Sequence, residues 1–349
     1  MARRRILFIY PWPDRTFIQK DEQILARHFD LRVLHFRRTA AFYREMAGLL
    51  WRREVDLVYL WFLMPDYASL ALALCRRAGI PFALVTGGYD VASIPGIRFG
   101  NMRKPHHRRL GGWVLRNADL ILPFSDFAGT EVLRWARPRG RMETVYPGID
   151  SGFFTPPPGP APRAGVITVG TVNPLFNIQK GMLTFARVSR LVPELEFTVI
   201  GRIAVDAAAE ELRRAGGPNL RLTGRRVSDE ELRGHYRSAG VYAQLSAHEG
   251  FGIAVAEGMA CGCIPVVCAG TASPEVVGPC GHTVPFGEAR ATAAAVRAAH
   301  AAGGAERAAA RERVVQEFPE SRRVEALLRL LSRGSPGDPF ARTGTEEAS

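Results

Sequence analysis

The amino-acid sequence predicts an α/β fold with two doubly wound domains in tandem. Short apolar runs alternate with helical stretches of about 10–15 residues, which is typical of βαβ units that build a parallel sheet. The pattern occurs twice, and the proline-rich segment 155–163 separates its two halves. A chain of 349 residues is long enough for two domains with a core each. We therefore predict an N-terminal domain over 1–154, a linker over 155–163 and a C-terminal domain over 164–317.

The first half begins with the apolar run Ile6–Tyr10, which is too short for a signal sequence and is predicted to be a strand. Apolar residues recur at helical spacing in Phe17–Phe29, which predicts a helix. Further strands are predicted at Leu31–Phe36, Asp56–Trp61, Pro81–Val85, Asp119–Pro123 and Met142–Tyr146. Further helices are predicted at Thr39–Arg53 and Tyr67–Ala78, with another that starts at Ser125.

The second half repeats this alternation after the linker. Strands are predicted at Gly165–Gly170, Leu195–Gly201, Leu220–Thr223, Val241–Leu245 and Ile264–Val267. Helices are predicted at Gly181–Leu191, Val205–Ala215, Ser228–Ser238, Glu288–Ala302 and Glu306–Glu317. A last helix within 318–333 is expected to pack back on the N-terminal domain, and the polar segment 334–349 is expected to be disordered. The cleft between the two domains is the expected ligand site.

The composition indicates a globular protein of a reducing compartment. Apolar residues make up 47% of the chain and charged residues 23%, as in ordinary soluble proteins. The five cysteines, an odd number in a long chain, do not indicate a disulfide framework. No apolar run reaches the ~18–20 residues of a membrane span. We therefore expect a cytoplasmic protein.

Positive charge is concentrated in the N-terminal half. The formal net charge is +12, and residues 1–154 hold 24 Lys and Arg against 14 Asp and Glu, whereas the remainder holds 22 against 20. The densest basic cluster surrounds His106-His107. A recognisable nucleic-acid module is absent, so nucleic acid is not an expected partner. Two alternatives match the charge: a peripheral contact with the anionic inner face of a membrane, or an acidic acceptor.

The pattern that carries most chemistry lies within Ser246–Glu275. There Glu249-Gly-Phe-Gly252 leads into a helix, and Glu257 follows eight residues after Glu249. Glycines let the backbone approach a ligand closely, and the first N–H groups of a helix are unpaired donors at the positive end of its dipole. A diphosphate would bind well at Gly250–Gly252, a ribose at Glu257 and a sugar at Glu249. The alternative is that both glutamates are surface or capping residues of an ordinary Rossmann turn.

Glu249-x7-Glu257, followed by Gly258-Met-Ala-Cys-Gly262, resembles the Glu-x7-Glu signature of family 4 glycosyltransferases, which are retaining enzymes of the GT-B fold. Thr223-Gly224 resembles the family's segment beside the nucleobase pocket, and Lys180-Gly181 resembles its diphosphate-binding lysine. The resemblance runs in order from Ile6 to Glu317. It also includes landmarks of the N-terminal domain: Gly88-Tyr-Asp90, Ala118-Asp119 and Tyr146-Pro-Gly-Ile-Asp150.

The resemblance implies transfer of a sugar from a UDP- or GDP-linked donor to an acceptor hydroxyl, with retention and without a metal ion or other cofactor. The acceptor would be a saccharide, a lipid-linked or another small molecule of cell-envelope polysaccharide, glycolipid or other glycoconjugate synthesis. Lys180 and Glu249 would be catalytic, and Asp90 is a candidate for orienting the acceptor, with a turn cap as its alternative role. The residues expected to bind the donor are Gly170, Thr171, Lys180, Gly224, Glu249, Gly250, Phe251, Gly252 and Glu257.

Two positions depart from the family's pattern. Thr171 stands where the family often has an arginine, and the loop Val172–Gln179 that follows is longer. Gly87 stands where many members carry a histidine. The candidates for the second positive charge are Arg202, Arg225 and Arg226. These departures leave two alternatives open: a GT-B-fold sugar-nucleotide epimerase, and a catalytically silent protein that binds a sugar nucleotide.

Overall fold

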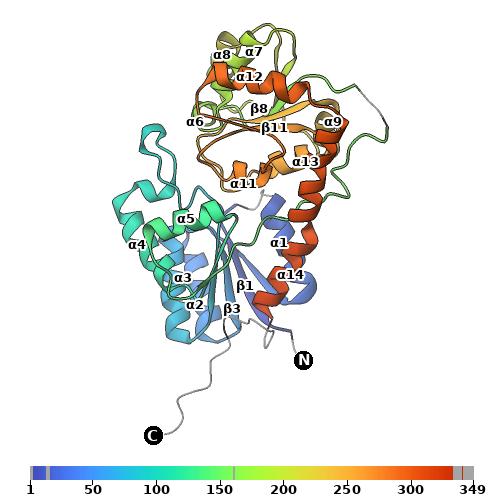
Figure 1. Ribbon diagram of the computed structural model, residues 1–349. Helices are drawn as coiled ribbons and strands as arrows, with labels where there is room; N and C mark the ends of the chain where they lie inside the picture. The colour runs from blue at the N-terminus through green and yellow to red at the C-terminus, as the bar shows by residue number, and fades with distance from the viewer. Residues whose placement is uncertain (1–2, 13–15, 160–161, 333–339, 341–349) are drawn as a thin grey trace. The chain divides into compact units, whose positions relative to one another are not determined.

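The computed structural model describes residues 3–12, 16–159, 162–332 and 340. The chain divides into two compact units (Figure 1): unit 1 contains residues 1–146 and 321–349, and unit 2 contains residues 147–320. Each unit has one six-stranded parallel sheet, so the predicted tandem of two α/β domains is confirmed. The segment 334–349, except for Phe340, and residues 160–161 of the linker lie outside the described residues.

In unit 1 the strand order is β2-β1-β3-β4-β5-β6. The strands are β1 (Arg5–Tyr10), β2 (Asp30–His35), β3 (Leu57–Trp61), β4 (Phe82–Thr86), β5 (Leu120–Pro123) and β6 (Arg141–Met142). The helices are α1 (Thr16–His28), α2 (Ala40–Trp51), α3 (Pro65–Ala78), α4 (Pro105–Asn117), α5 (Asp126–Trp135) and α14 (Glu320–Leu331), with short 3-10 turns η1 (Pro95–Ile97) and η2 (Asn101–Arg103).

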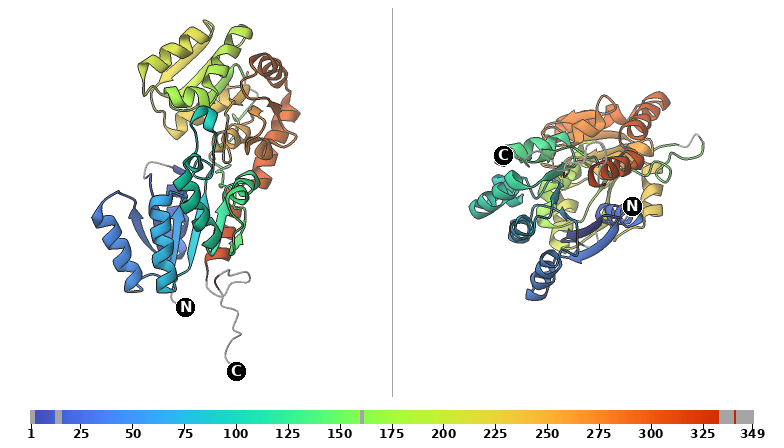
Figure 2. Two further views of the ribbon diagram at one scale, coloured as in Figure 1. Left: turned by 90° about the vertical axis from the view of Figure 1, so that its left-hand side faces the viewer. Right: turned by 90° about the horizontal axis from the view of Figure 1, so that it is seen from below.

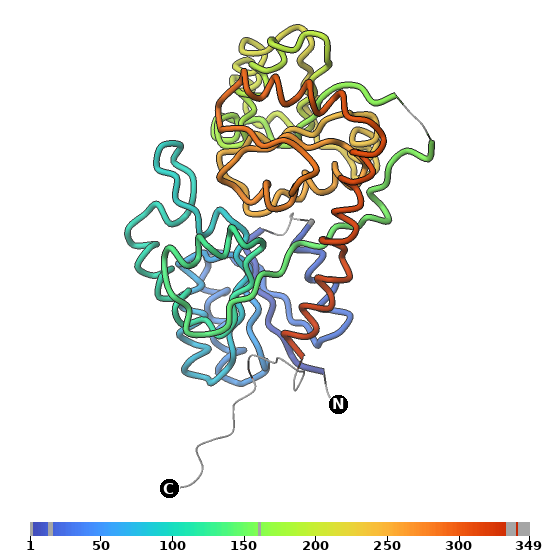
Figure 3. The backbone as a smooth tube through the Cα atoms, in the orientation of Figure 1, coloured from blue at the N-terminus to red at the C-terminus, as the bar shows by residue number. Residues whose placement is uncertain are grey.

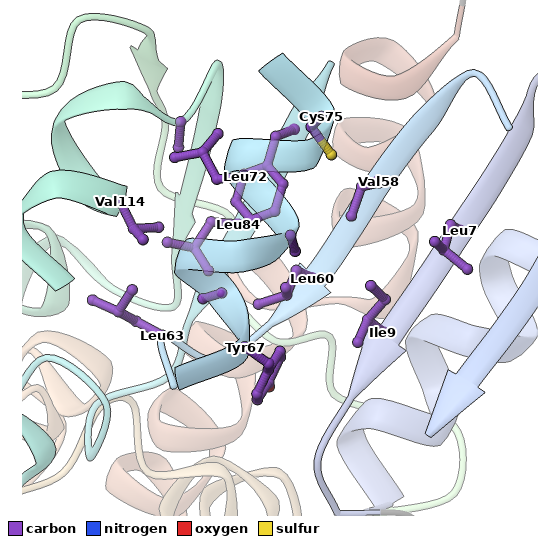
Figure 4. Close-up of a cluster of buried hydrophobic side chains, with 14 of the residues drawn as sticks. Leu7, Ile9, Val58, Leu60, Leu63, Tyr67, Leu72, Cys75, Leu84 and Val114 are labelled. Atoms are coloured by element: carbon purple, nitrogen blue, oxygen red, sulfur yellow. The ribbon is translucent and has the colours of Figure 1, made fainter. Parts of the chain in front are cut away.

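Alternate residues of the unit 1 strands point to opposite faces of the sheet. Leu60 of β3 is buried with Leu72 of α3 and Val114 of α4 (Figure 4). The helices α2 and α3 lie side by side over this face (Figure 2). The preceding residue of the strand, Tyr59, points to the other face, where its hydroxyl donates to Asp21 of α1 at 2.9 Å. The period-2 apolar pattern therefore gives the sheet a core on each side.

The last helix, α14, belongs to unit 1 from Ser321 onward, although all of unit 2 precedes it in the sequence. Its red trace lies beside the blue α1 in Figure 3. Arg323 Nε and Nη2 each lie 2.6 Å from a carboxylate oxygen of Asp21, and both side chains are buried. Arg323 Nη1 also donates to the carbonyl of Val145 at 2.9 Å. A buried ion pair thus joins α14 to α1.

In unit 2 the strand order is β12-β11-β10-β7-β8-β9. The strands are β7 (Val166–Val169), β8 (Phe197–Arg202), β9 (Leu220–Gly224), β10 (Val241–Gln244), β11 (Ile264–Cys268) and β12 (His282–Val284). The helices are α6 (Pro174–Gln179), α7 (Met182–Leu191), α8 (Asp206–Ala215), α9 (Asp229–Ser238), α10 (Ile253–Ala260), α11 (Ser273–Val277), α12 (Ala289–His300) and α13 (Gly304–Glu317). Within the described part of the chain, no helix has the length and apolar character needed to cross a bilayer.

The structure differs from the sequence prediction in two places near the sites. The segment 172–179, predicted to be a loop, contains α6, because the Asn173 side chain accepts a hydrogen bond from the Phe176 N–H at 2.8 Å and Pro174 suits the first helical position. The strand predicted at Met142–Tyr146 is only the two-residue β6, which starts one residue earlier. The helices α4 and α11 and the strand β12 were not predicted as elements.

Candidate functional site

The loop between β10 and α10 lies at the carboxyl edge of the unit 2 sheet. β10 ends at Gln244, and α10 starts at Ile253, directly after Gly252. Gly252 has a φ of +102°, which favours glycine because other residues are strained there. The carbonyl of Glu249 accepts the Ala272 N–H at 3.1 Å, which fixes the loop to the segment after β11. The N-terminus of α10 is thereby presented at the sheet edge with the positive end of its dipole.

Lys180 and Glu249 form an ion pair in this loop region. Lys180 Nζ lies 2.7 Å from Glu249 Oε1, and the two side chains are 27% and 14% exposed. The same oxygen accepts the Ser246 hydroxyl at 2.8 Å and the Gln244 amide at 2.9 Å. Gln244 in turn accepts the Tyr242 hydroxyl at 2.9 Å. One carboxylate oxygen therefore collects three donors, and the network fixes the orientation of both charged groups.

The segment around Lys180 is held against the β10–α10 loop by its neighbours. The Gln179 amide donates to the carbonyl of His248 at 2.7 Å, and the carbonyl of Gln179 accepts the Ala247 N–H at 2.8 Å. Gly181, with a φ of +66°, approaches the carbonyl of Leu245 so closely that a β-carbon there would overlap it. Gly181 is therefore required for Lys180 to reach Glu249 from α6.

Glu257 lies in the second turn of α10 and is half-buried. Its Oε2 accepts the hydroxyl of buried Tyr236 at 3.0 Å. Burial raises the pKa of Tyr236 well above its usual value, and the nearby Glu257 raises it further. The phenol therefore stays protonated and remains a donor to Glu257. The ring of Phe251 is buried against Phe318, with centroids 5.2 Å apart.

Gly170, Thr171 and Gly224 lie at the same carboxyl edge as the β10–α10 loop. Gly170 and Thr171 follow β7, and Gly224 ends β9 with a φ of +74°. Close packing of Gly201 on the Gly170 carbonyl leaves no room for a side chain at Gly201. The backbone of Arg202 accepts the Val172 N–H at 2.9 Å, which sets Arg202 beside Thr171.

The three arginine candidates for the second positive charge have different surroundings. Arg225 forms an exposed ion pair with Glu231. Arg202 and Arg226 are exposed, and neither has an ion-pair partner among the described residues. Because Arg202 ends β8, next to β7, it is the candidate with the best position beside Thr171.

Three polar residues of this region were not found by sequence reasoning: Gln244, Ser246 and Ser273. Gln244 is 3% exposed, and a buried glutamine at the end of an apolar strand was the signal available for it. The hydroxyl of Ser273 is fully buried and has no hydrogen-bond partner among the described residues. A β-carbon at Gly252 would lie 3.2 Å from that hydroxyl, so Ser273 lies beside the start of α10.

In unit 1 the carboxylate of Asp90 is fully buried at the carboxyl edge of the sheet. It accepts the N–H groups of Leu63 at 2.9 Å, Gly87 at 3.1 Å and Gly88 at 2.9 Å, the geometry of a turn cap. Burial raises its pKa to about 6, although the three N–H donors act in the opposite direction. The ring of Phe62 fills the space in front of Gly87, which explains why no larger side chain stands there.

Two parallel six-stranded α/β units, each with its glycine-rich turns at the carboxyl edge of the sheet, define a GT-B fold. A solved glycosyltransferase of Rickettsia africae ESF-5 has a TM-score of 0.71 at 13% identity, covering 94% of this chain and 97% of that chain. HepE of Anabaena, solved in complex with UDP and glucose, has a TM-score of 0.71 at 16% identity, covering 92% and 97%. At such low identity, these likenesses concern the fold.

Two family models match the sequence. The model described as Glycosyltransferase Family 4 matches residues 2–153, and the model described as Glycosyl transferases group 1 matches residues 163–301. The chain belongs to the family 4 glycosyltransferases.

Curated relatives match parts of the chain. O-antigen chain mannosyltransferase B of Escherichia coli is 31% identical over 186 residues, which is 48% of this chain and 48% of that protein. D-inositol 3-phosphate glycosyltransferase of Segniliparus rotundus is 26% identical over 250 residues, which is 66% of this chain and 54% of that protein. The chain spans about half the length of the curated relatives it matches.

Proposed function

We propose that this protein transfers a sugar from a nucleotide-diphosphate sugar to an acceptor hydroxyl, with retention of configuration and without a metal ion. The ion pair of Lys180 and Glu249, 2.7 Å apart in the loop region before α10, is the observation that supports this proposal most. An ammonium group and a helix N-terminus together form a favourable environment for a diphosphate. Membership of the family 4 glycosyltransferases supports the same class of reaction.

In the proposed reaction the bond between the anomeric carbon and the β-phosphate oxygen breaks, and the nucleoside diphosphate leaves with the bonding electrons. The acceptor oxygen bonds to the anomeric carbon on the same face, and its proton passes to the departing phosphate oxygen. Negative charge therefore develops on the diphosphate, where Lys180 and the N–H groups at Gly250–Gly252 would stabilise it. Glu249 would bind sugar hydroxyls through Oε2, because Oε1 already accepts three hydrogen bonds.

The donor contacts follow from the same arrangement. Glu257 is proposed to bind the ribose, and Gly224 to border the base, while Gly170 and Thr171 approach the phosphates. Arg202 is proposed to replace the arginine missing at Thr171. The partnerless hydroxyl of Ser273 beside Gly252 supports a further contact with a donor oxygen. Likeness to HepE, whose structure contains UDP, supports a UDP-linked donor, and a GDP-linked donor is the other candidate.

The acceptor side is proposed to lie on unit 1, with a saccharide, lipid-linked or other small acceptor. Buried Asp90 would help to orient the acceptor by holding the backbone of Leu63, Gly87 and Gly88 in place. Aromatic rings meet where the strands of unit 1 end: Phe62 packs against Trp12 at 4.9 Å and Phe17 at 6.3 Å between centroids. Such rings suit a sugar ring or an apolar group. The E. coli relative is named for an O-antigen chain, which supports a role in cell-envelope polysaccharide or glycolipid synthesis.

A peripheral contact with an anionic membrane is also proposed, through α4. This helix has Arg109, Leu110, Trp113 and Arg116 exposed at positions i, i+1, i+4 and i+7, so basic and apolar side chains share one exposed face. Basic amphipathic helices of this kind bind anionic bilayer surfaces.

The test uses the full chain with UDP- and GDP-linked sugars, and it measures release of nucleoside diphosphate with and without a chelator of divalent metals. Release in the presence of the chelator is expected from wild type. Lys180→Ala should lower the rate about 100-fold or more, since electrostatic stabilisation of this kind contributes ~2.7–4 kcal/mol.

The matched control is Arg187→Ala, which removes an exposed cation from α7 in the same unit. It should keep the wild-type rate. Donor binding without turnover by wild type would contradict the proposal in favour of a silent binding protein. Free sugar epimer as the only product would instead indicate an epimerase, and loss of activity with the chelator would contradict metal independence.

A further inference from the structure

Unit 2 contains a basic cavity of about 570 Å³, which is within the range of small-ligand pockets. Its walls come from the proline-rich segment, from Arg163 before β7, from Gly262 before β11, and from the end of α12 and the first part of α13. Three arginines line it: Arg163, Arg307 and Arg311. Its other lining residues are Pro156, Pro157, Gly159, Gly262, His300, Ala302, Gly303, Gly304 and Ala308.

The three guanidinium groups are half-buried, and in the described residues they donate only to backbone carbonyls. Arg163 donates to the carbonyl of Cys261 at 2.6 Å, and Arg307 to that of Gly240 at 2.7 Å. Arg311 donates to the carbonyls of Ala260 at 2.6 Å and Phe154 at 3.0 Å. None has a carboxylate within ion-pair distance in the described part of the chain. The cavity therefore gathers three positive charges with no described carboxylate in ion-pair distance, and the nearby Glu306 carboxylate instead accepts the Gly303 N–H at 2.6 Å.

Two further observations indicate a positive potential in the cavity. The pKa of Arg307 is lowered, first by burial and then by the neighbouring charge of Arg163. The N-terminus of the 14-residue helix α13 also opens on the cavity at Gly303 and Gly304. Both effects favour an anion, which would relieve the repulsion between the arginines and would share the helix N-terminus with Glu306, whose carboxylate accepts the Gly303 N–H.

This cavity is separate from the region around Glu249. Arg163 precedes β7, and Gly240 and Gly262 precede β10 and β11, so the cavity lies at the amino edge of the sheet. The β10–α10 loop follows the carboxyl end of β10. Four residues of β10, at about 3.3 Å each, separate the two edges by about 13 Å.

We infer that this cavity binds a small soluble diphosphate, bound by Arg163, Arg307 and Arg311 together with the N-terminus of α13. Guanidinium groups suit phosphate because their paired N–H donors match its oxygens. Inorganic pyrophosphate and the diphosphate of a nucleotide share this chemistry. The inference is independent of whether the protein transfers sugar.

Calorimetric titration of the full chain with pyrophosphate and with ADP tests the inference. A Lys180→Ala background weakens diphosphate binding beside Glu249. In that background, Ala308→Glu places a carboxylate in the cavity without removing any arginine contact, because Ala308 is exposed on α13 and lines the cavity. It should weaken pyrophosphate binding at least about tenfold, since one charge-assisted contact contributes that much.

The matched control is Ala309→Glu, which adds the same charge one residue further along α13, outside the cavity lining. Its affinity for pyrophosphate should equal that of the Lys180→Ala parent. The inference is supported if Ala308→Glu removes the binding of pyrophosphate or ADP and Ala309→Glu does not. Comparison of the two affinities shows whether the nucleoside contributes. Absence of saturable binding in the parent, or equal binding by both glutamate variants, overturns it.

Discussion

At the residue scale, the two oxygens of Glu249 have different surroundings. Oε1 accepts Lys180, Gln244 and Ser246, whereas no described protein group bonds to Oε2. An oxygen that already accepts three hydrogen bonds holds Lys180 in position. The other oxygen can bind a hydroxyl group of a ligand. In the proposed donor site, this division would let one carboxylate position the Lys180 ammonium for the diphosphate and contact the sugar at the same time.

Sequence reasoning proposed Lys180 and Glu249 as site residues through a motif, because both are charged groups beside glycines, and the structure places the two in an ion pair. It did not identify Gln244 or Ser246, since polar residues at a strand end resemble ordinary edge residues until the fold brings them to the same oxygen. Ser273 was missed for a similar reason: its burial depends on packing against the start of α10, which no local pattern encodes.

The buried carboxylate of Asp90 gives a prediction about pH. Its folded pKa is about 6, whereas an unfolded aspartate titrates near 3.9. The folded state thus binds the proton more tightly than the unfolded state. Below about pH 4, Asp90 therefore makes its full contribution to the free energy of unfolding. It is lost as the pH rises through 6, by about 3 kcal/mol in all. Urea unfolding gives the free energy of unfolding of wild type and of Asp90→Asn. The wild-type value should fall relative to that of the variant as the pH rises from 4 to 7.

Tryptophan fluorescence suits this measurement, because all five tryptophans belong to unit 1, as Asp90 does. Other carboxylates titrate in both proteins and cancel in the difference. A difference that stays constant from pH 4 to 7 would show that Asp90 does not titrate in this range.

At the element scale, α6 shows how a local signal can be present and still be overlooked. Asn173-Pro174 is an N-cap followed by a favoured first residue, yet the helix has only six residues and no apolar periodicity to reveal it. Its position matters more than its length. It ends immediately before Lys180, so the segment that the sequence presented as an extra loop is the element that carries the ammonium group.

The helix α4 gives a prediction about membranes. Arg109→Glu reverses one charge on its exposed basic and apolar face. Since a basic residue near an anionic bilayer contributes about 1 kcal/mol, the reversal should lower partition into phosphatidylglycerol vesicles by about 2 kcal/mol, or about 30-fold. Sedimentation with such vesicles at low salt measures the effect, which should shrink as salt screens the charges.

Arg187→Glu on α7 is the control for this measurement, because it makes the same change of net charge on an exposed residue of unit 2. If Arg109→Glu and Arg187→Glu lose vesicle binding equally, the net charge of the protein and not α4 is responsible for the binding. Absence of wild-type binding at low salt would remove the membrane proposal.

At the scale of the whole molecule, the two units are not two separate lengths of chain. Unit 1 takes its first 146 residues from the N-terminus and its last helix from the C-terminus, so all of unit 2 lies between them. Hydrophobic patterns predicted both parallel sheets, because buried strands are nearly continuous apolar runs. The pairing of Asp21 with Arg323 could not be predicted in this way, since it joins residues 302 positions apart.

This ion pair gives the last prediction. Asp21 is 0% exposed and Arg323 5%, and Tyr59 also donates to the same carboxylate. Arg323→Met leaves the carboxylate buried without its counter-charge, so the unfolding free energy of unit 1 should fall by about 3–5 kcal/mol. Arg329→Met, on the same helix, removes a partly exposed pair with Glu143 and should cost less, about 1 kcal/mol. Tryptophan fluorescence in urea reports both changes.

Removing both buried charges separates the ion pair from simple packing of the helix. Asp21→Leu combined with Arg323→Met replaces the pair with apolar side chains, which often costs little because the desolvation penalty of both ions disappears with them. The double variant should therefore recover most of the loss seen with Arg323→Met alone. If it is as unstable as the single variant, α14 stabilises unit 1 through the geometry of the arginine contacts, including those with the carbonyls of Val145 and Tyr146, and not by neutralising Asp21.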